Sequence, residues 1–175
     1  FYLQHIRGYS PQSTGIILVS QPIVQAIFSP LAGKISDRIE PRIVASSGMA
    51  LTAAGLFLLA LLREATPVST IVANLVLLGL GFAFFSSPNT NAIMSSVENR
   101  FYGIASSMLA TMRLLGQMFS MGIAMLMFAL YIGRVEIQPV YYPQLLKSTR
   151  IAFVVFGVLC VLGTFASLTR GNVRE

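Results

Sequence analysis

Five apolar stretches, each long enough to cross a lipid bilayer, alternate with short polar segments along the chain. A transmembrane helix needs about 20 predominantly apolar residues. The stretches show none of the period-two alternation of polarity that the strands of a membrane barrel require. The pattern therefore predicts an all-α integral membrane protein with five transmembrane helices. The predicted spans cover residues 14–33, 43–62, 68–94, 104–131 and 151–169.

The segments between the spans carry prolines and charged residues, and the segment 133–150 is predicted to be the longest loop. Basic residues are slightly more numerous on the side of the bilayer that holds the 33–42 loop and the C-terminus. Because basic residues concentrate in cytoplasmic loops, this excess favours a cytoplasmic C-terminus. We expect the protein to lie in the plasma membrane, which is the inner membrane in a cell that has two.

The composition supports the membrane assignment and excludes other classes. Hydrophobic residues make up 55% of the chain and charged residues only 10%, whereas soluble domains carry about 25% charged residues. A soluble enzyme and a disordered protein are therefore both excluded. The net charge of +6 comes from basic residues that form no run. These charges are expected to contact lipid headgroups, so the lipid bilayer is the predicted partner and nucleic acid is not.

Residues suited to catalysis or metal binding are scarce. The chain has one cysteine, Cys160, and one histidine, His5. One cysteine allows no intrachain disulfide, and the histidine has no constellation around it that suits zinc or a Ser-His-Asp triad. No phosphate-binding glycine loop is present, so nothing supports self-powering by ATP. We expect no enzyme activity, no catalytic residue, no metal site and no cofactor.

Strongly polar side chains gather in the spans 14–33, 68–94 and 104–131. A polar side chain in a membrane is costly, which makes each one a candidate for function. In the span 104–131, small and polar residues recur at steps of three and four on one helix face. For the amide side chains, hydrogen bonding between helices and the lining of a ligand cavity are equally open interpretations. The candidate substrate-pathway residues are Gln21, Gln25, Asn74, Asn89, Arg113 and Gln117.

Arg113 is the one charged residue well inside a predicted span. An arginine at the centre of a transmembrane helix costs about 2.5–3.5 kcal/mol on insertion scales. One interpretation is a snorkelling or structurally paired side chain. The other is a cavity-lining arginine that helps to hold a substrate or a coupling carboxylate. No predicted span contains an acid, so a carboxylate partner would come from a ligand or from a part of the protein outside these spans.

The loop 33–42, with the sequence GKISDRIEPR, resembles the signature loop of the major facilitator superfamily, G-x-x-x-D-R/K-x-G-x-R. The matching residues are Gly33, Asp37, Arg38 and Arg42, and Glu40 stands where the motif has glycine. The N-terminal segment 2–15 and the segment 100–122, with its run GIASS, are similar to corresponding parts of the fourteen-helix drug:proton antiporter branch. The order of these motifs extends the resemblance over essentially the whole chain.

The resemblance implies that the chain is the last five helices of a transporter whose N-terminal half is missing here. It also implies that the first, third and fourth spans line the central cavity and that the other two lie outside. The loop of Gly33, Asp37, Arg38 and Arg42 would act as a conformational latch at the cytoplasmic face, with an ordinary short loop as the alternative. In such a transporter the two halves rock around a substrate site near the middle of the membrane.

The expected function is secondary active transport of a small-molecule substrate, namely proton-coupled efflux of drug-like or amphipathic compounds by alternating access. The proton gradient would drive it in place of a cofactor. Phenylalanine and methionine side chains in the spans suit adaptable apolar binding, although they suit lipid contact as well. The alternatives are a uniporter or nutrient symporter on the same fold, and a membrane module that does not transport.

Overall fold

The structure is a computed structural model that describes residues 2–63, 65–131 and 142–169, with the side chains of residues 5 and 6 left aside. It begins with a short π-helical turn, η1, and continues through five α-helices with one 3-10 turn, η2, before the fourth. The elements are η1 (Tyr2–Ile6), α1 (Pro11–Ser36), α2 (Pro41–Ala60), α3 (Val68–Ser95), η2 (Asn99–Phe101), α4 (Tyr102–Tyr131) and α5 (Tyr142–Leu168). The described residues contain no strand.

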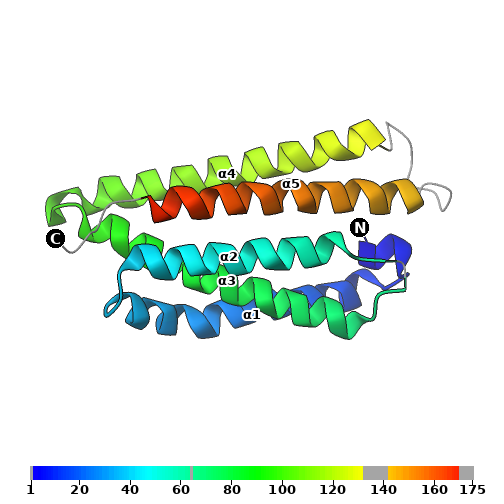
Figure 1. Cartoon of the computed structure of the whole chain (residues 1–175), viewed down its shortest axis with the longest axis horizontal. Coiled ribbons are helices and arrows are strands. Elements are labelled where there is room, and N and C mark those ends of the chain that lie inside the picture. The colour runs from blue at the N-terminus through cyan, green and yellow to red at the C-terminus, as the bar shows by residue number, and fades with distance from the viewer. Residues whose placement is uncertain (1, 64, 132–141, 170–175) are drawn as a thin grey trace.

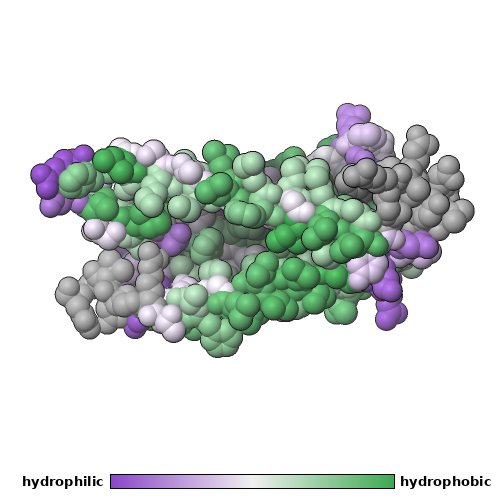
Figure 2. Space-filling view, turned by 90° about the horizontal axis from the view of Figure 1, so that it is seen from above, coloured by the Kyte–Doolittle hydropathy of each residue, from purple (hydrophilic) through white to green (hydrophobic). Residues whose placement is uncertain are grey.

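All five helices are long and apolar enough to cross a membrane, which confirms the predicted fold class. At 1.5 Å per residue, the shortest, α2 with 20 residues, is about 30 Å long and matches the hydrocarbon core. The helices lie side by side along the long axis, with α4 and α5 in one layer and α1, α2 and α3 in the other (Figure 1). Apolar residues form a continuous band in the middle of the molecule, and hydrophilic residues gather at its two ends (Figure 2).

The largest departure from the predicted boundaries is at α5, which begins at Tyr142, inside the segment that the sequence predicted to be a loop up to residue 150. Pro143 stands in the first turn of the helix, where a missing N–H costs nothing. Leu145, Leu146 and Ser148 are buried, so packing stabilises these first turns despite their polar neighbours. Residues 133–141 of the predicted loop lie outside the described residues.

The helix α1 is longer than its predicted span at both ends. Ser10 caps its N-terminus, where the Ser13 N–H donates to the Ser10 hydroxyl at 3.2 Å. The helix runs without a break through Pro22 and Pro30, and α3 does the same through Pro88. Each proline removes one backbone donor and so leaves one carbonyl of its helix without the usual partner.

Glycines set the close approach of α2 and α3. A Cβ atom at Gly48 would lie 2.4 Å from the backbone nitrogen of Phe85, and one at Gly81 would lie 2.5 Å from the Thr52 hydroxyl. No side chain fits at either position without movement of the backbone. Small residues that let two backbones touch are the usual means of packing helices in a membrane. The pair α2–α3 is therefore the tightest part of the fold.

Hydrogen bonds to two adjacent carbonyls hold the end of α2. The Arg150 guanidinium of α5 donates through Nε to the Leu62 carbonyl at 2.7 Å and also donates to it through Nη2. The Tyr2 hydroxyl donates to the Arg63 carbonyl at 2.6 Å. A basic side chain at a helix C-terminus satisfies carbonyls that have no partner within the helix. These contacts join α5 and η1 to α2.

In contrast, α4 is attached loosely. None of its residues is buried, and it contacts α5 and, over a shorter stretch, α3. Most of its surface is therefore open in this chain, including both its polar and its methionine-rich sides. The few polar contacts between α4 and α3 consequently contribute much of what holds α4 in place.

Candidate functional site

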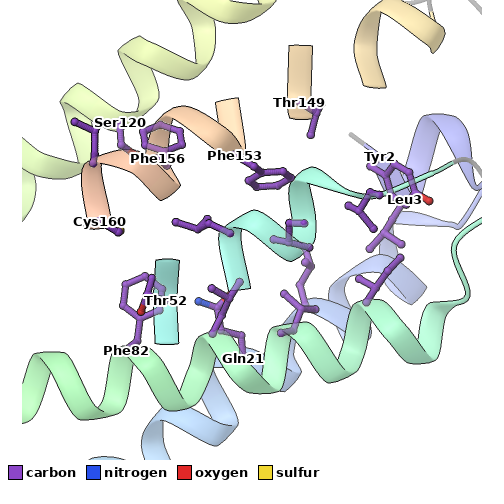
Figure 3. Close-up of a pocket in the computed structure, with 18 of the residues that line it drawn as sticks. Tyr2, Leu3, Gln21, Thr52, Phe82, Ser120, Thr149, Phe153, Phe156 and Cys160 are labelled. Carbon is purple, nitrogen blue, oxygen red and sulfur yellow. The ribbon is translucent and has the colours of Figure 1, made fainter. Parts of the chain in front are cut away.

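A cavity of about 710 Å³ lies between the two helix layers. Phe153 and Phe156 of α5 face Gln21, Thr52 and Phe82 across it, and Tyr2 and Leu3 stand at one end (Figure 3). Ser120 and Phe128 of α4 complete the wall, so all five helices contribute. The resemblance had assigned cavity lining to the first, third and fourth spans, and this cavity also draws residues from α2 and α5. Its size suits a drug-sized molecule.

Few polar atoms in this cavity are free to bind a ligand. The Thr52 and Thr149 hydroxyls donate to carbonyls of their own helices at 2.9 and 2.7 Å. The Thr14 hydroxyl is buried and has no hydrogen-bond partner among the described residues. Gln21 lies two turns further along α1, and Ser120 lies on the α4 side. An aromatic wall with a few polar groups is typical of a site for an amphipathic molecule.

Arg113 is held by α3. Its Nη2 atom donates to the hydroxyls of Ser86 at 3.2 Å and Thr90 at 3.0 Å. One turn of helix separates the two acceptors, and Pro88 lies between them. Two helical turns before Arg113, the Ser106 hydroxyl lies 3.9 Å from the sulfur of Met94. The polar side of α4 thus faces α3 at Ser106 and Arg113 and the cavity at Ser120.

The three asparagines of α3 have separate surroundings. Asn74 is buried and donates to the Gly55 carbonyl of α2 at 3.0 Å. Asn91 donates to the Ser36 hydroxyl of α1 at 3.3 Å. Asn89 lines a smaller apolar groove between the ends of α3 and α4, together with Met108 and Met112. Asn74 therefore joins two helices, and Asn89 is open to a groove.

The other two pathway candidates do not line either cavity. Gln25 is half-buried one turn beyond Gln21, and Gln117 is exposed one turn beyond Arg113. The structure thus brings Gln21 to the large cavity and joins Arg113 to α3. Sequence reasoning missed Thr14, Ser86 and Thr90. The run SSPNTN at residues 86–91 was the available signal, because six residues with polar side chains or proline rarely occur together inside a transmembrane helix.

The signature loop joins α1 to α2. Asp37 caps the C-terminus of α1, where its N–H donates to the Gly33 carbonyl at 3.1 Å, and its side chain is exposed like that of Arg38. A Cβ atom at Gly33 would lie 3.1 Å from the Ser87 hydroxyl, so glycine keeps α1 close to α3 here. Glu40 has a φ of −49°, a value that needs no glycine. The substitution in the motif is therefore compatible with the turn.

Candidate metal ligands are absent from the part of the chain that the structure describes: no three His, Cys, Asp or Glu side chains gather there. Residues 1–174 match the sequence profile of the Major Facilitator Superfamily. The chain belongs to this superfamily. The match covers the signature loop, the five spans and every pathway candidate named above.

Two relatives of the chain are transporters by name, and a third is named as a multidrug resistance protein. The chain is 39% identical over 117 residues to the uncharacterized transporter YebQ of Escherichia coli, which is 67% of this chain and 26% of that protein. It is 30% identical over 155 residues to the riboflavin transporter RibZ of Clostridioides difficile, covering 89% of this chain and 32% of RibZ. It is 31% identical over 115 residues to the multidrug resistance protein Stp of Mycobacterium tuberculosis, covering 66% of this chain and 21% of Stp. The chain therefore spans about a quarter to a third of the first two relatives.

Proposed function

We propose that the chain is part of a secondary transporter that exports drug-like or amphipathic small molecules and is driven by the proton gradient. The large cavity carries the proposal. Its walls are mainly phenylalanines and aliphatic side chains; Thr14, whose hydroxyl has no hydrogen-bond partner among the described residues, and Gln21 and Ser120 supply polar groups. Such a site recognises shape and apolar surface and makes no demand on one chemical structure. The name of the relative Stp supports the same reading.

Within this proposal the signature loop controls alternating access. Asp37 and Arg38 are exposed at the end of α1, where they can contact the other half of a transporter. A charge at this place favours one of the two rocking states, as a latch does. The protein would lie in the plasma membrane with this loop and its C-terminus in the cytoplasm. Its partners would be the bilayer, the transported molecule and the N-terminal half.

A second candidate is uniport or symport of a nutrient. The alignment with RibZ, a riboflavin transporter by name, covers 89% of this chain. A flat ring system would fit between the phenylalanines of the cavity. A membrane module that does not transport is the third candidate, because five helices alone do not enclose a two-sided path.

Transport by the purified protein in liposomes separates these candidates. Ethidium and riboflavin are each supplied on either side, with and without an imposed proton gradient. We expect ethidium to move against its concentration gradient only when the proton gradient is present. Phe156→Ala, in the cavity, should reduce this transport several-fold, whereas Phe165→Ala, which is 64% exposed on the same helix, should not.

The alternative outcomes are equally specific. Riboflavin movement down its gradient without protons would favour the nutrient transporter. Movement of neither compound in any condition would favour the module that does not transport. Unfolding temperatures of both variants are measured in parallel, so that a loss of transport through instability is recognised.

A further inference from the structure

We propose that Arg113, Ser86 and Thr90 form a binding site for a carboxylate inside the membrane. This inference rests on the proposed function only for the origin of the carboxylate, which is either the transported molecule or another part of the transporter. The site lies between α3 and α4 and shares no residue with the wall of the large cavity.

Arg113 lies well inside the length of α4, where a charged side chain is costly. Arg113 is eleven residues from Tyr102, the first residue of α4, so about 17 Å of helix separates it from that end. Its guanidinium donates to the hydroxyls of Ser86 and Thr90, which lie nine and five residues before Ser95, the last residue of α3. Among the described residues the partners of the arginine are thus hydroxyls of a neighbouring helix, and its charge stays within the length of the apolar helices.

The two partners of Arg113 do not neutralise this charge. Ser86 and Thr90 are uncharged, and the acids Asp37, Glu40 and Glu98 stand in the connections between the described helices. Glu98 pairs with Arg100 just before α4, at 2.8 Å. A charge in a membrane is less costly when an opposite charge pairs with it, so an anionic partner beyond these residues would stabilise Arg113.

The hydrogen bonds leave donors available for that partner. Both bonds to the hydroxyls start from Nη2, so the N–H groups of Nε and Nη1 are free among the described residues. The Thr90 hydroxyl donates to the Ser86 carbonyl at 2.8 Å, and Thr90 therefore serves only to position the guanidinium. The Ser86 hydroxyl accepts from Arg113 and keeps its own hydrogen. A carboxylate beside Arg113 can thus accept from the guanidinium and from Ser86.

A carboxylate fits this depth better than a phosphate does. A carboxylate carries one charge, which the guanidinium balances, whereas a phosphate at neutral pH adds charge that stays unpaired in a medium of low dielectric. The site formed by Arg113, Ser86 and Thr90 is consequently predicted to bind carboxylic acids more tightly than their esters.

The test is the binding of rhodamine B, which carries a free carboxylate, and of its ethyl ester, to the purified protein with no ion gradient. We expect the acid to bind at least ~10-fold more tightly than the ester, the ratio that one hydrogen bond to a charged group supplies. Arg113→Gln should abolish this ratio, and Thr90→Val should reduce it. Arg100→Gln, which removes a positive charge at the beginning of α4, should leave the ratio unchanged.

A second measurement identifies a carboxylate that belongs to the protein. In that case the two dyes bind alike, and Arg113→Gln lowers the unfolding temperature of the ligand-free protein far more than Thr90→Val does, because an acid is left unpaired. The proposal is overturned if the acid has no advantage and both variants lower the unfolding temperature equally. Since no gradient is applied, failure of this test is distinct from failure to transport.

Discussion

At the scale of single residues, polar side chains inside the spans divide into those that join helices and those that remain available. Asn74, Asn91 and Arg113 each donate to an oxygen of a neighbouring helix. Gln21 lines the large cavity and makes no such bond to another described residue. Sequence alone could place these residues inside the membrane, because they stand within long apolar runs, and it could mark them as candidates because their insertion is costly. It could not separate the two groups, since partner choice depends on which helices become neighbours.

The bond from Asn74 to Gly55 predicts a structural effect. Asn74→Ala should lower the free energy of unfolding by about 1 kcal/mol, the usual contribution of one hydrogen bond, and leave the KM for a transported dye unchanged. Gln21→Ala is the matched variant and should raise that KM with little change in stability. Thermal unfolding in detergent and dye transport measure the two quantities. A raised KM with unchanged stability for Asn74→Ala would instead place this residue in the substrate pathway.

At the scale of helices, the apolar runs predicted all five elements because lipid demands about 20 apolar residues per span. The early start of α5 could not be predicted from such runs. Its first turn contains Tyr142, Pro143 and Gln144, and it is helical because Leu145 and Leu146 pack against other elements. The position of α4 likewise could not be predicted from the sequence. It depends on hydroxyl groups of α3, and a single serine or threonine in an apolar run does not reveal which helix it contacts.

The contact of α2 with α3 predicts a strong effect of adding one methyl group. Gly48→Ala should lower the free energy of unfolding by about 1–3 kcal/mol, because the new Cβ collides with the backbone of Phe84 and Phe85. Gly116→Ala on α4 meets nothing within 4 Å and should be neutral or slightly stabilising. Urea or thermal unfolding in detergent compares them. Equal effects of the two variants would contradict the close packing.

At the scale of the whole molecule, the signature loop lies at the same end of the bundle as the connection from α3 to α4 (Figure 1). The family motif could be recognised from Gly33, Asp37, Arg38 and Arg42 alone. The reason for Gly33 could not be recognised, since it depends on contact with Ser87 of α3. The loop therefore follows directly on a helix that packs closely against α3.

The proposed latch role of the loop predicts a change in the transport rate. Asp37→Asn should slow transport several-fold and leave the affinity for the transported compound nearly unchanged, because Asp37 is remote from the lining of the cavity. Asp37→Glu keeps the charge and should retain most of the rate. Initial rates in liposomes, together with dye binding, provide the comparison. Identical rates for the wild-type protein and Asp37→Asn would show that the loop is an ordinary connection.

The direction of the bonds that asparagine and arginine side chains make between helices bears on how the protein is made. Asn74, Asn91, Arg113 and Arg150 each donate to an oxygen on a segment that precedes them in the chain. During synthesis the acceptor therefore enters the bilayer first. Each side chain that is costly to insert then finds its hydrogen-bond acceptor already in the membrane. The serine and threonine of α3 are already in place when α4 leaves the ribosome. Because α3 precedes α4 in the chain, its hydroxyls thus lower the free-energy cost of inserting Arg113 into the membrane.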